Sequence, residues 1–435
     1  MNKFLFFWKE LLSTFWFLPV LIISLAVFLS ITTVTIDNFF ELTKDGWICI
    51  FLVNDPDSAR SILSTISGAM IGVAGTVFSV TLVALTLASS QFGPRLVKNF
   101  MYVKLNQVVL GSYISTYLYC LLVLNAIKNV EGEIFIPSIS ILLAILAAIA
   151  NIVLLIVFIH RIAVSIQADK VIADISEFMA AHLIDLYPEK LDENKVFKRN
   201  IGIDAATSSY PKRVSIKSNT SGYLQYISFE VLLDLITKDN SLLVVHNKQG
   251  NYIVNGIEIA ELWTHSNYEA EKIEKLLNQF VIGKTKTPQQ NLEYSIQQLV
   301  EMAARALSPG INDPFTAMAC IDNLASTMSY LAQAKFPSTQ KHDEDDILRI
   351  ISKAEDFEGL LDTSFNQIRQ YSSGMPAVII RLMEALTTIQ KFTTKETHKK
   401  AVIKHARMVL FLGEESINEK NDIDDLKDRA RKVLP

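Results

Sequence analysis

The stretch ILSTISGAMIGVAGTVFSVTLVALTLASSQFGPR, residues 62–95, decides how the rest of the chain is interpreted. It contains no charged residue before Arg95, and it is longer than the roughly 20 apolar residues that cross a bilayer. At about 100° per residue, one helical face collects its small and weakly polar residues, which are Ser64, Gly68, Gly72, Gly75, Ser79, Thr86 and Ser90. The sequence therefore predicts a membrane span with a distinctive small face.

Two roles are compatible with this small face. Glycine and serine let the backbone of a second helix approach closely, which is the usual basis of tight packing between membrane helices. A weakly polar face can also border a water-filled path through the bilayer. The sequence leaves both roles open, and both concern the same positions.

The rest of the chain divides into an apolar and a polar part. Residues before about 165 are strongly apolar, whereas the remainder of the 435 residues carries most of the charge. This contrast predicts a membrane protein with a large soluble region. The net charge of −4 gives no indication of nucleic-acid binding. Cys49, Cys120 and Cys320 are too far apart to suggest a disulfide framework or a zinc site.

Four segments are apolar enough to span the membrane. None of them contains Asp, Glu, Lys or Arg, and they are residues 11–36, 62–90, 107–127 and 138–159. The first is too long for the apolar core of a signal peptide, so we expect a retained span. The apolar segment Trp47–Val53 is too short to cross and is expected at the interface. Residues 1–165 thus form the predicted transmembrane domain.

Basic residues in the short loops predict the orientation of these spans. Lys and Arg prevail before the first span, between the second and third, and after the fourth. The opposite loops mix fewer basic residues with several Asp and Glu residues. Because an excess of Lys and Arg marks cytoplasmic loops, we expect both termini and the soluble region in the cytoplasm.

The soluble region is predicted to begin with a helix that continues span four. No Gly or Pro interrupts this segment, so residues 160–188 form the expected helical extension. Residues 189–267 are assigned to a linker and a small β module, because short alternating segments and glycine turns occupy Arg213–Trp263. The order of these segments resembles a barrel-sandwich half-motif of the lipoyl or biotinyl type. No lysine stands in a hairpin suited to cofactor attachment.

The remaining residues, 268–435, predict a cytoplasmic helical bundle. Apolar residues recur with a period of about 3.6, and the expected helices are residues 268–281, 289–307, 314–333, 344–371, 376–392 and 394–417. The charged tail, residues 418–433, is expected to be a frayed or solvated helix. The predicted fold class is therefore membrane α-helical with four transmembrane helices, joined to a cytoplasmic α+β region.

A corner between two of these helices, residues 305–317, is the most distinctive soluble stretch. Ser308-Pro309-Gly310 breaks the first helix, and Asp313 is placed to cap the second, which begins at Pro314. A helix-turn-helix corner explains those residues. It leaves Arg305, Ser308 and Asn312 without a role, so these three and Asp313 are candidates for a ligand or subunit contact. A helix start beside an arginine can hold an anion.

Other polar residues offer little chemistry. His160 stands at the predicted membrane boundary, either as an interfacial residue or as a gate. His398 and His405 are expected on a solvated helical face, and residues 341–346 are expected to be an acidic helix start. The chain has no P-loop, GxSxG, HExxH or GxGxxG motif. We therefore expect no enzyme activity, no cofactor and no metal site.

Several longer motifs resemble a known family. The segments AGTVFSVTLVALTLASSQFGPRLVKNFM, NQVVLGSYISTYLYCLLVL, FIHRIAVSIQ, SGYLQ and RALSPGINDPFTAMACIDNL occur here in this order. Together they resemble the domain-of-unknown-function family 2254, a group of predicted bacterial membrane proteins. The resemblance implies an integral membrane protein with several N-terminal spans and a soluble C-terminal region. It implies no activity.

Two functional hypotheses follow for a multi-pass protein of the bacterial inner membrane. The first is a homo-oligomeric channel, with the small face of span two lining the path and a cytoplasmic regulatory domain that binds an ion or small ligand. The alternative is a non-conducting membrane scaffold or sensor, in which the small face only packs helices and the cytoplasmic domain binds partners. An ion-coupled transporter is less favoured, because no ionisable residue lies inside a span.

Overall fold

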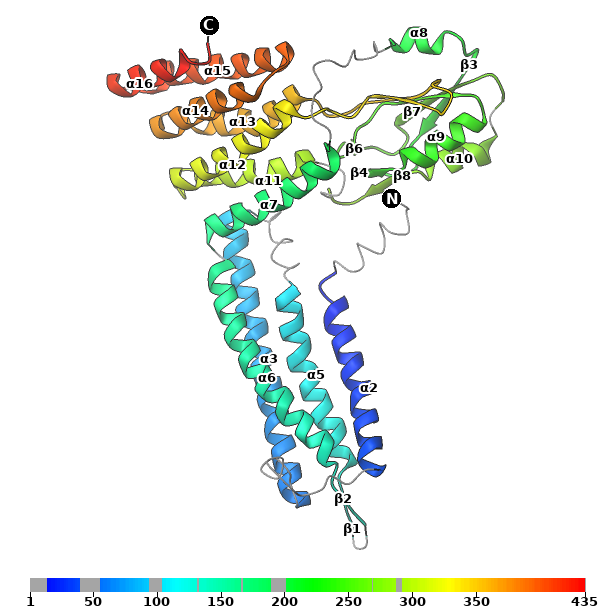
Figure 1. Cartoon of the computed structure of the whole chain (residues 1–435), viewed down its shortest axis with the longest axis vertical. Helices are drawn as coiled ribbons and strands as arrows, with labels where there is room; N and C mark the ends of the chain where they lie inside the picture. Colours follow the sequence, from blue (N-terminus) through cyan, green and yellow to red (C-terminus); the bar gives the residue numbers. More distant parts are fainter. Residues whose placement is uncertain are drawn as a thin grey trace. The chain divides into compact units, whose positions relative to one another are not determined.

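The computed structural model describes residues 14–39, 55–93, 104–130, 133–165, 167–188, 201–267, 269–286 and 292–434. These residues divide into two compact units, Met1–Lys170 and Val171–Pro435. We call them the membrane unit and the soluble unit and describe each by itself (Figure 1). The predicted interfacial segment Trp47–Val53 lies outside the described residues.

The membrane unit confirms the prediction of four apolar helices. The described helices that are long and apolar enough to cross a bilayer are α2 (Phe17–Phe39), α3 (Pro56–Phe92), α5 (Lys104–Ala126) and α6 (Ser138–Ser165). Figure 1 shows them side by side in this unit. A short antiparallel pair of strands, β1 (Lys128–Val130) and β2 (Glu133–Phe135), connects α5 to α6.

Helix α3 packs against its neighbours through one regular seam. Its buried positions alternate in steps of four and three residues, and they include Leu63, Ser67, Met70, Ala74, Val77, Thr81, Ala84 and Ala88. Such spacing keeps a helical face directed at a partner helix. Met70, Ala74 and Val77 share one apolar cluster with Tyr113 of α5 and Phe158 of α6. The seam therefore determines which side of α3 is directed inward.

A polar contact inside the membrane unit joins the same three helices. Asn151 of α6 is only 1% exposed. Its Nδ2 donates to Thr116 Oγ1 at 2.8 Å, and its Oδ1 accepts from Ser112 Oγ at 2.6 Å. Its Nδ2 also lies 3.6 Å from Met70 Sδ of α3. Hydrogen bonds of this kind hold membrane helices together where the hydrophobic effect does not distinguish protein from lipid.

A second polar contact joins the end of the first span to the start of the fourth. Asp37 of α2 is 8% exposed and accepts from Ile139 N at 2.8 Å and Ser140 N at 2.9 Å. Ser140 Oγ donates to the same carboxylate at 2.6 Å. Free N–H groups at a helix start need acceptors, so Asp37 caps α6 from another helix.

The boundary between the two units, after Lys170, falls within a separate helix. We predicted that span four would continue unbroken to about residue 188, but α6 ends at Ser165 and α7 (Ala168–Leu186) is a distinct helix. The amide of Gln167 still donates to Val164 O at 3.2 Å, and the amide of Lys170 donates to Gln167 O at 3.1 Å. These short-range bonds between carbonyls and amides three residues apart interrupt the α-helical ladder at this point.

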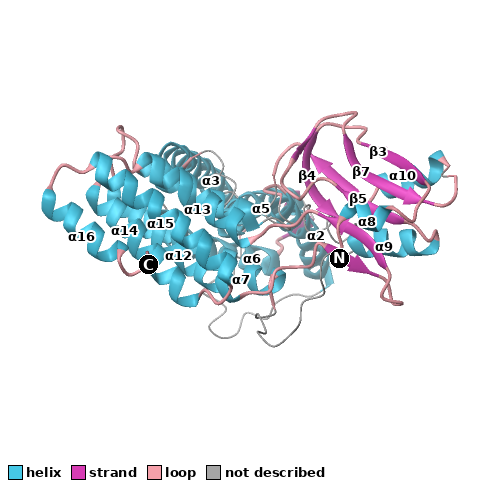
Figure 2. Cartoon of the chain, turned by 90° about the horizontal axis from the view of Figure 1, so that it is seen from above, coloured by secondary structure: helices cyan, strands magenta, loops and turns pink. Residues whose placement is uncertain are grey.

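The β module is larger than predicted. Its five-stranded sheet has the order β3 (Lys212–Lys217), β7 (Glu258–Thr264), β5 (Leu242–Val245), β10 (Leu348–Ser352) and β9 (Gln340–His342). A three-stranded sheet has the order β6 (Tyr252–Ile253), β4 (Gly222–Ile227) and β8 (Phe280–Gly283). In the soluble unit of Figure 2, strands β3, β7 and β5 lie next to one another. The helices that accompany them are α8 (Ile203–Thr207), α9 (Phe229–Lys238) and α10 (Ala270–Leu277).

Two strands include residues that we predicted to be helical. Strand β8 overlaps the end of predicted helix 268–281, while β10 and the turn before it occupy part of predicted helix 344–371. In the hairpin of β9 and β10, Asp343 Oδ2 accepts from Arg349 Nε at 2.7 Å, and both side chains are almost completely buried. Residues 341–346 are therefore a strand end and a turn rather than an acidic helix start, because this buried ion pair and the ladder to β5 outweigh local helix propensity.

The helical bundle follows the predicted pattern more closely. Its helices are α11 (Leu292–Ala306), α12 (Pro314–Gln333), α13 (Phe357–Tyr371), α14 (Pro376–Phe392), α15 (Glu396–Ser416) and α16 (Lys420–Ala430). Two expectations were wrong. The charged tail is not frayed, because Leu426 and Ala430 of α16 are buried. His398 and His405 are also buried, the first against Phe357 and the second bonded to Asp362 at 2.8 Å.

The contact at Asn151 generates a prediction about the membrane unit. We expect Asn151→Ala to destabilise the folded chain in detergent by about 1 kcal/mol, because Ser112 and Thr116 lose an interhelical partner. The measurement is the shift of the unfolding midpoint in a denaturing detergent. Asn38→Ala is the matched control, because Asn38 is exposed and its amide donates within its own helix, to Val34 O at 3.1 Å. Equal effects of the two substitutions would contradict the interhelical role.

Candidate functional site

The small face of α3 is exposed along its whole length. All of its members are exposed, and they are Ser64, Gly68, Gly72, Gly75, Ser79, Thr86 and Ser90. A β-carbon added at Gly68, Gly72 or Gly75 would meet no atom within 4 Å. The buried seam of α3 lies about 150° away around the helix axis. Among the described residues, therefore, no second helix packs on the small face.

The hydroxyl groups of Ser79, Thr86 and Ser90 on this face donate to carbonyls of α3 itself. Ser79 Oγ donates to Gly75 O at 2.9 Å, Thr86 Oγ1 donates to Leu82 O at 2.9 Å, and Ser90 Oγ donates to Leu87 O at 2.9 Å. Such bonds let a hydroxyl side chain sit in an apolar environment at little cost, while its remaining lone pairs still accept from water. The face suits either a close helix neighbour or a hydrated path.

The predicted corner is present in the soluble unit. Asp313 Oδ1 accepts from Thr316 N at 3.1 Å and caps α12, as expected. Ser308 Oγ donates to Arg305 O at 2.6 Å and so ends α11. Asn312 has a φ of 49°, a left-handed conformation that asparagine tolerates better than most residues. The corner itself thus explains Ser308 and Asn312, which the sequence left without a structural role.

Of the four residues predicted to contact a ligand or subunit, the structure places only two around one hollow. Arg305 and Ser308 line an open hollow of about 410 Å³ with residues of α13, whereas Asn312 and Asp313 are not among its lining residues. Ile311 and Phe315 of the same corner are 44% and 77% exposed. The corner therefore presents exposed apolar side chains beside a hollow that both Arg305 and Glu301 line, and its role in ligand or subunit contact stays a prediction. His160 is exposed near the end of α6, where its role as a gate also stays a prediction.

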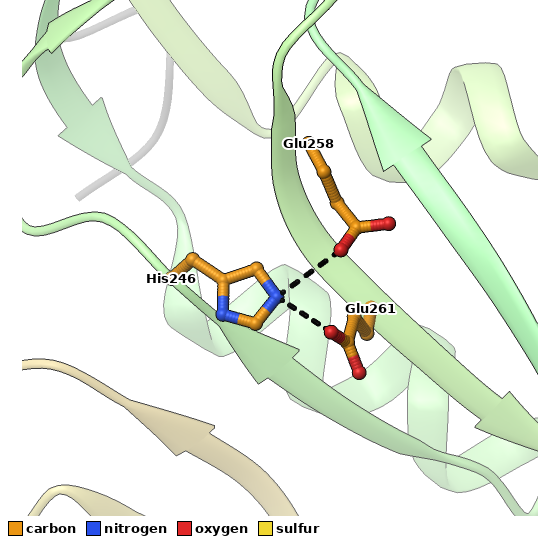
Figure 3. Close-up of side chains that lie close together, drawn as sticks. All are labelled: His246, Glu258 and Glu261. Carbon is orange, nitrogen blue, oxygen red and sulfur yellow. Dashed lines mark hydrogen bonds and ion pairs between the residues drawn. The ribbon is translucent and has the colours of Figure 1, made fainter.

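A cluster that we did not predict lies on the five-stranded sheet. Figure 3 shows His246, which follows β5, directed at Glu258 and Glu261 of β7. His246 Nε2 lies 3.0 Å from Glu261 Oε1 and 3.6 Å from Glu258 Oε1. Arg213 Nη2 of β3 approaches the same two oxygens, at 2.8 Å and 2.6 Å respectively. The three side chains in the figure could hold a metal ion.

A register shift in the sheet explains how both glutamates face one histidine. Residues three apart in a regular strand point to opposite faces. Here Ile216 pairs with Ala260 but Lys217 pairs with Glu258, so β7 contains one extra residue. Ile259 and Ala260 are consecutively buried, and Glu258 and Glu261 emerge on the same side. Bulges of this kind redirect side chains next to functional sites.

The charges of this cluster are strongly coupled. A hydrogen bond from Arg213 is the largest of the effects that lower the pKa of Glu261 to about 2, although burial opposes it. Trp263 Nε1 donates to the other oxygen of Glu261 at 3.0 Å. Glu261 is therefore ionised throughout the physiological range and is held in one orientation.

A neighbouring hollow of about 500 Å³ lies where the parallel strands β5 and β10 end and α13 begins. His246 lines it, together with charged and polar residues of the loops after both strands, namely Lys248, Asn251, Ser352, Lys353, Glu355 and Asp356. The carboxyl ends of parallel strands are a common place for ligand binding. Asp356 Oδ1 already caps α13 by accepting from Gly359 N at 2.8 Å.

Glu355 is the unusual group of this hollow. Burial is the main cause that raises its pKa from 4.5 to about 7, and the nearby carboxylate of Glu293 adds to the effect. Lys248 opposes the shift but is itself paired with Glu293 at 2.7 Å. Glu355 thus titrates near neutral pH, in a range where ordinary carboxyl groups are fully ionised.

The comparison with protein families concerns nearly the whole chain. Residues 12–388 match the family model described as a predicted membrane protein, DUF2254. The chain belongs to the DUF2254 family. The four apolar helices of the membrane unit and the mixed soluble unit agree with the description of this DUF2254 member as a membrane protein.

Curated relatives of this DUF2254 chain come from mycobacteria. It is 28% identical over 373 residues to the uncharacterized protein Rv1290c of Mycobacterium tuberculosis and to the uncharacterized protein Mb1321c of Mycobacterium bovis. Each alignment covers 84% of this chain and 70% of the relative. No solved structure matches the chain.

The missed residues carried no local sequence signal. His246 precedes Glu258 and Glu261 by more than ten residues, without a spacing typical of a metal motif. Only the pairing of β5 with β7 and the extra residue of β7 bring them together. Glu355 likewise needs the loop after β10, a strand that local patterning did not predict.

The cap of α12 gives a prediction for the corner. We expect Asp313→Ala to lower the stability of the protein by about 1 kcal/mol, because the amide of Thr316 loses its acceptor. The measurement is thermal unfolding of the purified full chain. Asp313→Asn keeps an acceptor for this amide and should lose much less stability than Asp313→Ala. If both variants lose the same stability, the cap is not the role of Asp313.

Glu355 gives a prediction about pH. A carboxyl group whose pKa is raised by folding contributes stability that is fully present below its ordinary value of 4.5 and is lost as the pH rises through about 7. We therefore expect Glu355→Gln to be near neutral at pH 5 and to stabilise the chain at pH 8 by about 2 kcal/mol, a figure discounted for partial exposure.

Thermal unfolding of the full chain at both pH values measures this effect. Glu358→Gln is the matched control, because Glu358 lies on the exposed side of α13 and pairs with Lys404 at 2.8 Å. A stabilisation that does not depend on pH would exclude the raised pKa of Glu355 as its cause.

Proposed function

We propose that this chain is the subunit of a homo-oligomeric channel of the bacterial inner membrane, in which the small face of α3 borders the path. The soluble unit is proposed to lie in the cytoplasm, with both termini, and to regulate the path by binding a ligand. The exposure of every member of the small face is the observation that supports the proposal best.

Two kinds of exposed surface occur on the membrane unit. The outer side of α6 carries large apolar side chains, and those at least 48% exposed include Leu146, Ile149, Ile152, Val153 and Ile156. Such residues are typical of contact with lipid tails. The small face of α3 instead combines three glycines with hydroxyl residues over most of the helix. This difference favours protein or water, rather than lipid, as its surroundings.

A second copy of the chain is the natural source of the missing partner. Gly68 and Gly72 stand four residues apart, the spacing that lets two membrane helices approach closely. Subunits arranged about an axis would then place Ser79 and Thr86, farther along the same face, toward the centre. A ring of weakly polar residues supports a hydrated path without an ionisable group inside the membrane.

Accessibility of a cysteine at position 79 tests the channel. Cys49, Cys120 and Cys320 are first replaced, and Ser79→Cys is compared with Ile152→Cys, which is 57% exposed on the apolar side of α6. We expect a water-soluble thiol reagent to modify only the first variant and to change the current in planar bilayers. Thiol reagents act on the hydrated thiolate, so a lipid-facing cysteine reacts slowly.

Other outcomes distinguish the alternative function. If the oligomer forms but Ser79→Cys stays unmodified and no current appears under voltage, tension or a change of pH, the small face only packs helices. The protein would then be a non-conducting scaffold or sensor.

A further inference from the structure

We propose that His246, Glu258 and Glu261 form a binding site for one divalent transition-metal ion of the zinc type. The proposal concerns the soluble unit and does not depend on the channel. It rests on the distances between the three ligand atoms, on the charge of the cluster, on the bulge that assembles it and on its open side.

The distances already fit a metal ion. Zinc bonds to nitrogen and carboxylate oxygen are about 2.0–2.2 Å long, so two ligands of a tetrahedral ion are about 3.3 Å apart. His246 Nε2 lies 3.0 Å and 3.6 Å from the two carboxylate oxygens, on either side of that value. All three ligand atoms lie within 4.8 Å of one another. Small rotations of the side chains would complete the site without moving the strands.

The charges of the cluster favour a cation. The carboxylates of Glu258 and Glu261 face one guanidinium, that of Arg213, so the group carries one net negative charge when His246 is neutral. Arg213 Nη2 donates to the same oxygens that would bind the metal and keeps the two carboxylates together in its absence. Its side chain is 45% exposed, so it can move away when a divalent ion enters.

The chemistry of the ligands indicates the class of ion. One imidazole with two carboxylates suits zinc and its neighbours in the first transition series, whereas calcium and magnesium prefer oxygen ligands alone. Three protein ligands leave at least one position of a tetrahedral ion open. His246 also lines the 500 Å³ hollow beside β10, from which water or a small anionic ligand could fill that position.

A site built only for an ion pair has a simpler design. One glutamate would suffice to form an ion pair with Arg213. A regular strand β7 would direct Glu258 and Glu261 to opposite faces of the sheet. The extra residue in β7 places a second carboxylate beside the first, next to an imidazole. Trp263 Nε1 donates a hydrogen bond to Oε2 of Glu261, which leaves Oε1 of the same carboxylate for His246 and the ion. In known metal sites, hydrogen bonds from neighbouring residues orient the ligating side chains in the same way.

The test uses the full chain, purified in detergent and stripped of metal with a chelator. Co²⁺ is added as a coloured substitute for Zn²⁺, and its visible absorption reports ligand type and stoichiometry. We expect one Co²⁺ per chain, displaced by Zn²⁺, and a thermal midpoint that rises with the free Zn²⁺ concentration. Absence of both the spectrum and the midpoint shift in the wild type would overturn the proposal.

Variants separate a metal site from an ion-pair network. His246→Ala should lose the Co²⁺ spectrum. Glu258→Gln changes the side-chain volume little, and we expect it to bind Co²⁺ more than about tenfold more weakly than the wild type. Loss of a residue that only hydrogen-bonds a metal ligand already weakens metal affinity by about that factor. His265→Ala is the matched control, because His265 is exposed just after β7 and lies outside the cluster. Binding by folded His246→Ala that equals binding by the wild type refutes the assignment.

Arg213→Gln gives a result that only a metal site predicts. Removing the competing guanidinium should leave Co²⁺ binding intact or tighten it, while the metal-free chain loses stability because two carboxylates now face each other. Added Zn²⁺ should restore the thermal midpoint of this variant more than that of the wild type. Failure of Zn²⁺ to raise the midpoint of folded Arg213→Gln would mean that the cluster is an ion-pair network only.

Discussion

The hydrogen bonds of Asn151 are the contact on which the arrangement of the membrane unit depends. An amide inside an apolar span has to find partners in other helices, and Asn151 finds them in Ser112 and Thr116 beside Met70. These partners define the inward sides of α5 and α6 and, through the buried seam, that of α3. The small face of α3 is outward for the same reason. The need of Asn151 for hydrogen-bond partners thus decides which surface of α3 remains available to other molecules.

Hydropathy was sufficient to predict the four apolar helices of the membrane unit because lipid leaves few alternatives. A span has to satisfy its own backbone, so length and apolar content alone identify it. The contacts between spans were not predictable in this way. Asn151 and Asp37 look like isolated polar residues in the sequence, and only the packed helices show that one joins three spans and the other caps α6.

The soluble unit shows where local patterns fail. Helices α12 and α14 were predicted with their observed bounds, since a proline begins each of them and Asp313 also caps α12. Strand β10 was not, because its residues pair with β5, which lies about a hundred positions earlier in the chain. The cluster at His246 depends on the pairing of β5 with β7 and on the extra residue of β7, and the position of Glu355 depends on β10. Residue types alone therefore indicated no site there, although the corner near Asp313 was found from its turn chemistry.

The position of β10 between β5 and β9 also constrains the order in which the chain can fold. As the ribosome delivers the chain, β3, β5 and β7 emerge first, and β5 then presents an unpaired edge until residues 348–352 arrive. Contacts between distant segments form slowly, and exposed strand edges are prone to aggregation during that interval. Translation of α11 and α12 precedes that of β10, so the sheet cannot be completed before two helices of the bundle have been synthesised.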